Sequence, residues 1–572
     1  MRLIISQFLR TLRERDEFDS LLPDLLLAMG YVPLAKPQTG VRQFGVDQAA
    51  VGKSPTDGEN ELILFVIKKG DLGRRDWDNP EPTSIRSSLN EVLDVYLTKM
   101  IPPEYSSYRK VVVLATTGDL KQEIEFNWTS YKEQNAQKAS FEFWGADKVS
   151  DLIELHMLDE NLFAAEDWSD LRKALALAAD PEYDFQDFNR LLLRQLGMNA
   201  KGITIDSDVN TKQLKKAFKR VHLAALICAH WANVDGDSRK ALWSMERTLL
   251  WSWHRVMLLE HKEQKQFISI VAAMRFSHAE AGAKYFQVIG SHLSVKDAMA
   301  GYGSEGAGFS VVLFEHIGQI STLGLACVFE PGKTDEDKQR CASNIDALAD
   351  GLCALLENHE ASASPRLDNH IIDISLGLMF LLLAGRTEAA QFWLAHIAVR
   401  LDFCFNSRSG FPVGTDSLED LVDLQVTPTE RLIANLMQTS WCLATIAAWC
   451  AMLGMDKHYA LLAKGASDTY KDVCAQLWHP TADWTQYWYF GGVLATGNSE
   501  APYALPLDAA EMRQRMQSFL AIDEYNWPEG SPSRAVGIFI LDFIACRHFR
   551  VPVPASMWYR FLEMQVQFSA DE

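Results

Sequence analysis

The sequence predicts two kinds of structure in one chain: an α/β domain with a mixed sheet flanked by helices at the N-terminus, followed by a large all-α region. Residues 1–157 alternate amphipathic segments with short apolar runs, as expected where helices alternate with strands. From about residue 165, long amphipathic runs are separated only by short segments rich in Gly, Pro, Ser and Asp. A length of 572 residues also exceeds what one hydrophobic core usually supports.

Turn-forming residues divide the N-terminal domain into its expected elements. Helical periodicity ends at Gly30, and Pro55 and Gly58 mark the segment 52–60 as a polar turn. Residues 62–68 form a nearly continuous apolar run, which is typical of a strand buried on both faces. The expected elements are a helix at 4–28, strands at 31–34, 41–50 and 62–68, a helix at 84–98, a strand at 110–115, a helix at 120–137, a strand at 141–144 and a helix at 146–158.

We assign residues 1–158 to the α/β domain and residues 159–572 to the helical region, with a further break expected near 359–366. Two apolar stretches in the helical region raise the question of a membrane. Leu432–Gly454 has no charged residue and approaches the roughly 20 residues that a membrane span needs, and Ile371–Ala384 contains only Asp373. Because polar residues interrupt the first stretch and no basic cluster flanks it, we expect buried helices and no membrane span.

Composition limits the location and the partners of the protein. The formal net charge is −20, with 19 Lys and Arg against 22 Asp and Glu in residues 1–150, and 36 against 53 in the rest. Such an acidic helical region argues against a broad nucleic-acid-binding surface there, because phosphate contacts need Lys and Arg. Nine cysteines without a CxxC pair indicate small core residues in a reducing cytoplasm. The scattered histidines, such as His222, His230 and His254, are interpreted as structural.

An acid and a lysine follow extended segments at a spacing that suggests chemistry. Gly45-Val46-Asp47 ends one segment, and the apolar run from Leu62 ends in Lys68 about twenty residues later. Hydrolysis of a phosphodiester needs a polarised phosphoryl oxygen and an activated water, which carboxylate-held Mg²⁺ supplies. The first 155 residues contain no histidine. Chemistry based on histidine is therefore excluded from this domain, and carboxylate and lysine chemistry is left.

These residues carry a resemblance to a known family. The order of segments, Leu26-Leu27-Ala28-Met29-Gly30-Tyr31, Thr39-Gly40 before Gly45-Val46-Asp47, the strand that ends in lysine, and Phe143-Trp144-Gly145-Ala146-Asp147-Lys148 resemble a restriction-endonuclease-like nuclease of the PD-(D/E)xK, Mrr type. The resemblance covers about residues 1–158. It implies two acids that hold Mg²⁺ or Mn²⁺, a lysine that activates water, and cleavage of DNA or RNA. Many bacterial members join this domain to a sensor region in antiviral defence.

The chain departs from the family pattern at one position. The family places an acid or glutamine two residues before the lysine, where this chain has Val66 for Lys68. Glu91 on the following helix would supply the missing carboxylate, as a second metal ligand beside Asp47, and Glu17 on the first helix would supply an outer ligand. Without them, the domain is an inactive nuclease relic that binds nucleic acid or protein. An unrelated α/β fold is the third alternative.

The basic residues Lys69, Arg74, Arg75 and Arg86 are candidates for contacts with phosphate, since they follow the lysine strand or lie near a helix start. All the candidate residues also have ordinary interpretations. Asp47 would be a turn residue, Lys68 and Lys69 solvated charges at a strand end, and Glu91 and Glu17 surface residues of helices. The helical region is expected to sense, to regulate or to mediate contact with a further copy or a partner protein.

Overall fold

The structure is a computed structural model, and it describes residues 9–10, 18–34, 44–54, 57–79, 84–156, 165–178, 180, 183–205, 210–299, 307–332, 334–415, 417–479, 488–491, 498–499, 505–520, 533 and 536–559. The chain divides into two compact units. Unit 1 comprises Met1–Gln195 and Val209–Asp235, and unit 2 comprises Leu196–Asp208 and Gly236–Glu572. Each unit is described below by itself.

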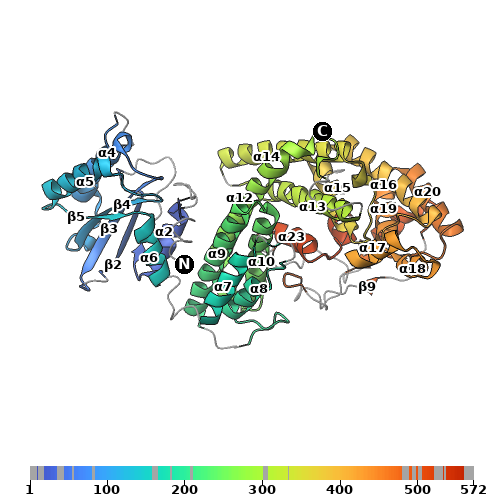
Figure 1. The fold of residues 1–572 in the computed structure, drawn as a ribbon, viewed down its shortest axis with the longest axis horizontal. Coiled ribbons are helices and arrows are strands. Elements are labelled where there is room, and N and C mark those ends of the chain that lie inside the picture. Colours follow the sequence, from blue (N-terminus) through green and yellow to red (C-terminus); the bar gives the residue numbers. More distant parts are fainter. Residues whose placement is uncertain are drawn as a thin grey trace. The chain divides into compact units, whose positions relative to one another are not determined.

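Unit 1 begins with a sheet and its covering helices (Figure 1). Its elements are α2 (Asp19–Ala28), β1 (Val32–Pro33), β2 (Gln48–Lys53), β3 (Asn60–Lys68), α3 (Arg74–Trp77), α4 (Ile85–Glu91), the π-helical continuation η2 (Val92–Met100), η3 (Pro103–Tyr105), β4 (Arg109–Thr116), α5 (Gln122–Asn135), β5 (Ser140–Trp144), α6 (Ala146–His156), α7 (Ala165–Leu177), α8 (Gln186–Leu196) and α9 (Thr211–Val234). Alternation of helices and strands in residues 1–157 is thus confirmed.

Within the described residues, five strands form one mixed sheet in the order β1-β2-β3-β4-β5. The pairs β1–β2 and β2–β3 are antiparallel, with Gln48 opposite Phe65, whereas β3–β4 and β4–β5 are parallel. Both parallel connections pass through helices, as parallel neighbours require. β4 is the middle strand of the parallel part, and β3 is the middle strand of the whole sheet.

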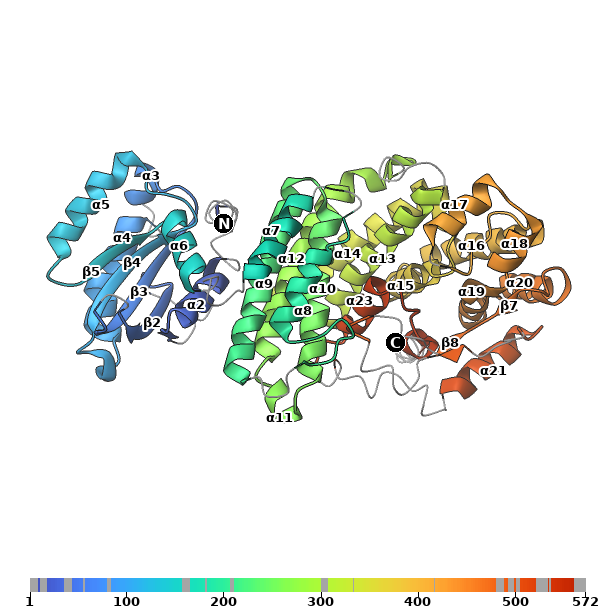
Figure 2. The ribbon, with the colours of Figure 1, turned by 60° about the horizontal axis from the view of Figure 1, so that its bottom comes forward.

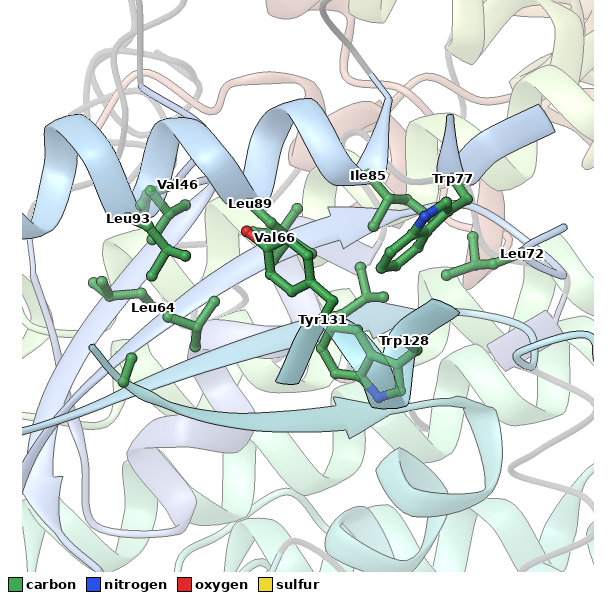
Figure 3. Close-up of a cluster of buried hydrophobic side chains, with 14 of the residues drawn as sticks. Val46, Leu64, Val66, Leu72, Trp77, Ile85, Leu89, Leu93, Trp128 and Tyr131 are labelled. Atoms are coloured by element: carbon green, nitrogen blue, oxygen red, sulfur yellow. The ribbon is translucent and has the colours of Figure 1, made fainter. Parts of the chain in front are cut away.

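The sheet is covered on both faces. On one face, Leu62, Leu64 and Val66 of β3 pack with Trp77 of α3, residues of α4 and η2, and Trp128 of α5 (Figure 3). On the other face, α2 contacts β2 and α6, and Phe65 meets Trp144 edge to face at 5.1 Å between ring centroids. Every residue from Glu61 to Ile67 is therefore buried, as the apolar run predicts.

Three local features of the sheet domain differ from the sequence-based expectation. Of the strand expected at 41–50, residues 41–43 lie outside the described residues, and β2 spans Gln48–Lys53 because its ladder with β3 continues through Gly52 to Lys53. Between the strand expected at 62–68 and the helix expected at 84–98, where no element was expected, lies the short helix α3. The helix expected at 84–98 begins at Ile85, where the Ser84 side chain accepts a hydrogen bond from the Ser87 N–H, and continues as η2 to Met100.

The remaining helices of unit 1 are tied by ion pairs. Arg194 of α8 donates to Asp167 of α7 at 2.8 Å and also contacts Asp170, which accepts from Arg190 at 3.2 Å. These carboxyls are buried beside partly exposed arginines. These ion pairs hold α8 against α7. Both helices belong to unit 1, which therefore extends beyond the sheet.

Unit 2 is a large helical region with short strand pairs (Figure 2). Its helices are α10 (Ser238–Met257), α11 (His261–Gln264), α12 (Ile268–Leu293), α13 (Ala307–Phe329), α14 (Asp335–Asn358), η5 (Glu360–Ala363), α15 (His370–Leu383), α16 (Thr387–Ser407), α17 (Leu418–Val426), α18 (Glu430–Leu436), α19 (Trp441–Met452), α20 (Asp456–Asp468), α21 (Ala509–Leu520) and α23 (Ile540–His548). Its strands are β6 (Thr439–Ser440), β7 (Cys474–Ala475), β8 (Trp478–His479) and β9 (Asn498–Ser499). An all-α region after the sheet domain is thus confirmed in its main features.

The two apolar stretches of the sequence contain the short buried helices α15 and α19. α15 spans His370–Leu383, and the stretch 432–454 is interrupted by β6, so α19 begins only at Trp441. Both helices are buried along almost their whole length. Among the described residues, one helical stretch, Gly308–Phe329, is long and apolar enough to cross a membrane, and 72% of it is buried in the protein.

Gly45 should be intolerant of any side chain. Its φ is +79°, and a Cβ added there would lie 2.2 Å from the Ser88 carbonyl oxygen. Gly58 has a similar φ of +75° with open space around it. We expect Gly45→Ala to destabilise unit 1 by more than about 2 kcal/mol and Gly58→Ala by about 1 kcal/mol, since only the first adds a clash to left-handed strain.

Thermal unfolding of the two variants beside the wild type tests this expectation. Equal losses at both positions would show that α4 does not hold the chain at Gly45.

Candidate functional site

Asp47 lies at a bulge where β2 begins. Gln48 is the partner of Phe65 in the ladder, yet the Asp47 N–H also bonds to the Phe65 carbonyl, at 2.8 Å. Two successive residues therefore face one, which is the arrangement of a β-bulge, a device that re-aims side chains. The Asp47 carboxylate accepts the Ile67 N–H at 2.7 Å through Oδ2. It thereby takes the place of a main-chain acceptor at the end of β3.

Lys68 ends β3 on the face of the sheet that α4 covers. Side chains alternate along a strand, so Lys68 shares its face with Val66 and Leu64 of the apolar cluster. The Lys68 Nζ lies 3.5 Å from Ser88 Oγ of α4, and the side chain is half-buried. The lysine is thus held under a helix at the same end of the β2–β3 pair as Asp47.

α4 brings Glu91 to the same end of the sheet. The chain at Gly45 runs against the Ser88 carbonyl and the Val92 side chain, because glycine permits that approach. Glu91 lies between these two residues in sequence and is half-buried. Asp47, Lys68 and the turn of α4 that carries Glu91 therefore lie at the same end of the sheet. Glu17 lies outside the described residues.

Val66 occupies the position where the PD-(D/E)xK pattern places its strand acid. It is completely buried, and its neighbours are apolar side chains of the cluster in Figure 3, including Leu89 and Leu93. No water or polar partner would reach a carboxylate there without opening this core. The strand itself therefore supplies no metal ligand.

The basic candidates surround this end of the sheet unequally. Lys69 and the α3 residues Arg74 and Arg75 are exposed, and no ion pair engages their side chains within the described residues. Arg86 differs, because it lies 3.4 Å from Asp78 in an exposed ion pair. The first three thus remain available for an anionic ligand.

A divalent metal fits these residues only in part. Carboxylate oxygens are the ligands that Mg²⁺ prefers, and Asp47 and Glu91 are the carboxylates that would hold it. Among the described residues, no group of three or more His, Cys, Asp and Glu side chains could hold a metal ion. Mg²⁺ in phosphoryl-transfer sites commonly takes one or two carboxylates and completes its shell with water and substrate oxygens. A pair of carboxylates is therefore the minimum set for this chemistry.

Sequence reasoning missed a second polar constellation at the same sheet. Gly70 and Gly118 follow β3 and β4 and touch so closely that a Cβ on Gly118 would lie 2.3 Å from the Gly70 carbonyl carbon. Asp71 accepts the Asp119 N–H at 3.0 Å, and Arg10 pairs with both aspartates. The signal was present, because each strand is followed by Gly-Asp. The group joins the two strand ends to each other.

Unit 2 contains a buried ionic network that sequence spacing also missed. Glu246 of α10 is 1% exposed and accepts from His278 Nε2 at 3.1 Å, from His548 Nδ1 at 3.0 Å and from Arg547. The Arg247 Nε–H donates to the other ring nitrogen of His548 at 2.8 Å, which requires a neutral ring. Burial alone would raise the pKa of Glu246, but Arg547 and the two histidines hold it below its usual range. The network connects α10, α12 and α23.

Comparison with known proteins identifies no relative: no family model, no curated protein and no solved structure matches the chain.

Restoring the acid of the family pattern should damage this protein. We expect Val66→Glu to destabilise unit 1 by more than about 3 kcal/mol, because the carboxyl would enter the apolar cluster without a partner. The same substitution at Val32, which is 60% exposed on β1, should change stability by about 0.5 kcal/mol or less. Urea unfolding measures both, and a stable Val66→Glu protein would contradict this burial.

Buried histidines should make unit 2 sensitive to acid. Burial lowers the pKa of His254 and of His548 to about 4, so the folded protein keeps both rings neutral. The unfolded chain binds their protons near pH 6.5, and stability should therefore fall as the pH drops from about 6.5 to 4, by on the order of 1.4 kcal/mol per pKa unit and ring.

The measurement is the melting temperature at pH 7.5 to 4 for the wild type, His254→Gln and the exposed control His261→Gln. His254→Gln should flatten the dependence, whereas His261→Gln should not. Parallel curves for all three proteins would refute the assignment of His254.

Proposed function

We propose that the N-terminal sheet domain is a divalent-metal-dependent nuclease that cleaves phosphodiester bonds of DNA or RNA. We propose further that the helical region regulates it, in bacterial antiviral defence. The observation that carries the proposal is the convergence of Asp47, Lys68 and the Glu91 turn of α4 at one end of the β2–β3 pair. An acid, a lysine and a second acid at one strand end are what the PD-(D/E)xK resemblance requires.

Each residue has a role that follows from its surroundings. Asp47 and Glu91 would hold Mg²⁺ or Mn²⁺, which supplies a Lewis acid for the phosphoryl oxygen and lowers the pKa of water. The Ile67 N–H donates to Asp47 Oδ2 at 2.7 Å and so helps to orient this carboxylate. Lys68 would stabilise negative charge that develops on the phosphoryl group. Lys69, Arg74 and Arg75 would contact the backbone of the nucleic acid.

A second function is favoured by the burial of Val66. Without a strand acid, the domain would be a non-catalytic scaffold that binds nucleic acid through Lys69, Arg74 and Arg75, or a partner protein through the helical region. Binding of nucleic acid without cleavage would then weaken with salt, because each neutralised phosphate releases counterions. The nuclease and the nucleic-acid-binding scaffold both use the basic residues, but only the nuclease needs the carboxylates of Asp47 and Glu91.

The test is incubation of the full-length protein with plasmid, single-stranded DNA and RNA in Mg²⁺, Mn²⁺ or EDTA. Asp47→Ala, Lys68→Ala and Glu91→Gln should each reduce metal-dependent cleavage by about a hundredfold or more, because each removes a group that acts on the reacting phosphate. Lys53→Ala is the matched control, since Lys53 is exposed at the far end of β2.

Binding of the same nucleic acids, measured by fluorescence anisotropy against salt, separates the two functions. Cleavage lost in the three variants but kept in Lys53→Ala supports the nuclease. Binding without cleavage, insensitive to Asp47→Ala but weakened when Lys69, Arg74 and Arg75 become alanine, supports the scaffold. If the protein neither cleaves nor binds these nucleic acids, both the nuclease and the nucleic-acid-binding scaffold are refuted.

A further inference from the structure

A pocket in unit 2 lies apart from the proposed nuclease site. It has a volume of about 820 Å³ and is formed by the end of α14, by η5 and by the first half of α16. Trp393 forms part of its wall, where the indole N–H donates to the Ser362 carbonyl at 3.0 Å and the ring is 3% exposed. Phe392 and His396 lie at its mouth, with ring centroids 4.2 Å apart. A volume of this size is enough for several side chains of a ligand.

An exposed apolar stripe continues from the pocket along α16. Phe392, Val399 and Phe403 are 64%, 50% and 69% exposed, and His396 lies between the first two. Their spacing of i, i+4, i+7 and i+11 places them on one face of the helix. At 1.5 Å per residue, the stripe is about 17 Å long. That length exceeds a small molecule and equals about three turns of a second helix.

The charges at the pocket are predominantly acidic after internal pairing. Arg386 binds Asp346 at 3.1 Å and Asp350 at 2.9 Å, and Arg400 donates to Ser364 at 2.8 Å and lies 3.5 Å from Glu360. Both arginines are therefore neutralised within the chain. The remaining acids at the pocket, Glu357 and Glu388, are exposed. Within the part of the chain that is described, neither makes an ion pair.

We propose that this surface, formed by the pocket and the α16 stripe, binds an amphipathic helix of a partner protein that carries Lys or Arg at its pocket end. Apolar residues of such a helix at i, i+3, i+4 and i+7 would cover Phe392, Val399 and Phe403. Its cations would meet Glu357 and Glu388 and the faces of the aromatic rings, which attract positive charge. A second copy of this surface would bring only Arg386 and Arg400, which already pair with acids of their own chain, and therefore offers no cation to Glu357 and Glu388. The proposal does not depend on the nuclease assignment.

The first experiment uses defined probes and the full-length protein. A fluorescein-labelled 14-residue Leu/Lys peptide with leucines at helical spacing should bind, whereas a Leu/Glu peptide of the same pattern should not. Phe392→Ser/Phe403→Ser should weaken binding of the Leu/Lys peptide by about tenfold or more, since central apolar anchors carry most of an interface. Phe126→Ser is the control, because Phe126 is 84% exposed on α5 in unit 1.

A second pair of variants separates the charge of this surface from the charge of the whole protein. Glu357→Lys/Glu388→Lys should reduce binding of the Leu/Lys peptide at least fivefold more than Glu125→Lys/Glu133→Lys, which makes the same change in net charge on α5. Unchanged melting temperatures confirm that the variants fold. Absent binding, or equal losses in both charge variants, overturns the proposal. Light scattering that shows a dimer lost in Phe392→Ser/Phe403→Ser also overturns it, in favour of a second copy.

Discussion

The burial of β3 on both faces is the constraint on which the sheet domain depends. Every residue from Glu61 to Ile67 is buried, so the helices on either side are held by one strand. That burial requires α4 to lie close to the sheet. Gly45, which has no Cβ, lets the chain just before β2 approach the Ser88 carbonyl of α4. It also excludes a carboxylate at position 66. The property that makes β3 the centre of the domain is therefore the property that removes the strand acid of the family pattern.

Sequence reasoning succeeded where burial and periodicity were strong. The runs at 62–68 and 110–115 are strands because their apolar residues are continuous, and the helices between them keep an apolar face. It failed where partners distant in sequence decide. β2 extends to Lys53 because β3 pairs with it, and α19 starts at Trp441 because the Ser440 hydroxyl caps it and Asp368 accepts N–H groups there. For the candidate site, spacing identified Asp47 and Lys68 but not the bulge or the Ser88 contact.

A buried ionic network lies in the interior of unit 2. Glu246 accepts hydrogen bonds there from its histidine and arginine partners on α12 and α23. Spacing in sequence could not identify this set, because His548 is 302 residues from Glu246. Such a network adds little net stability over an apolar core, but removing one member leaves a buried charge without compensation. Both ring nitrogens of His278 and of His548 have hydrogen-bond partners within the network.

The division of the chain into units has a consequence for its synthesis. Unit 1 takes residues 209–235 after the chain has already contributed residues 196–208 to unit 2. Synthesis therefore completes the sheet about ninety residues before α9, the last helix of unit 1, is made. A nascent chain that ends at residue 195 presents α7 and α8 without their third helix. The sheet domain would thus emerge from the ribosome before α9. A fragment that ends at residue 195 would expose apolar surface of α7 and α8 to chaperones and proteases.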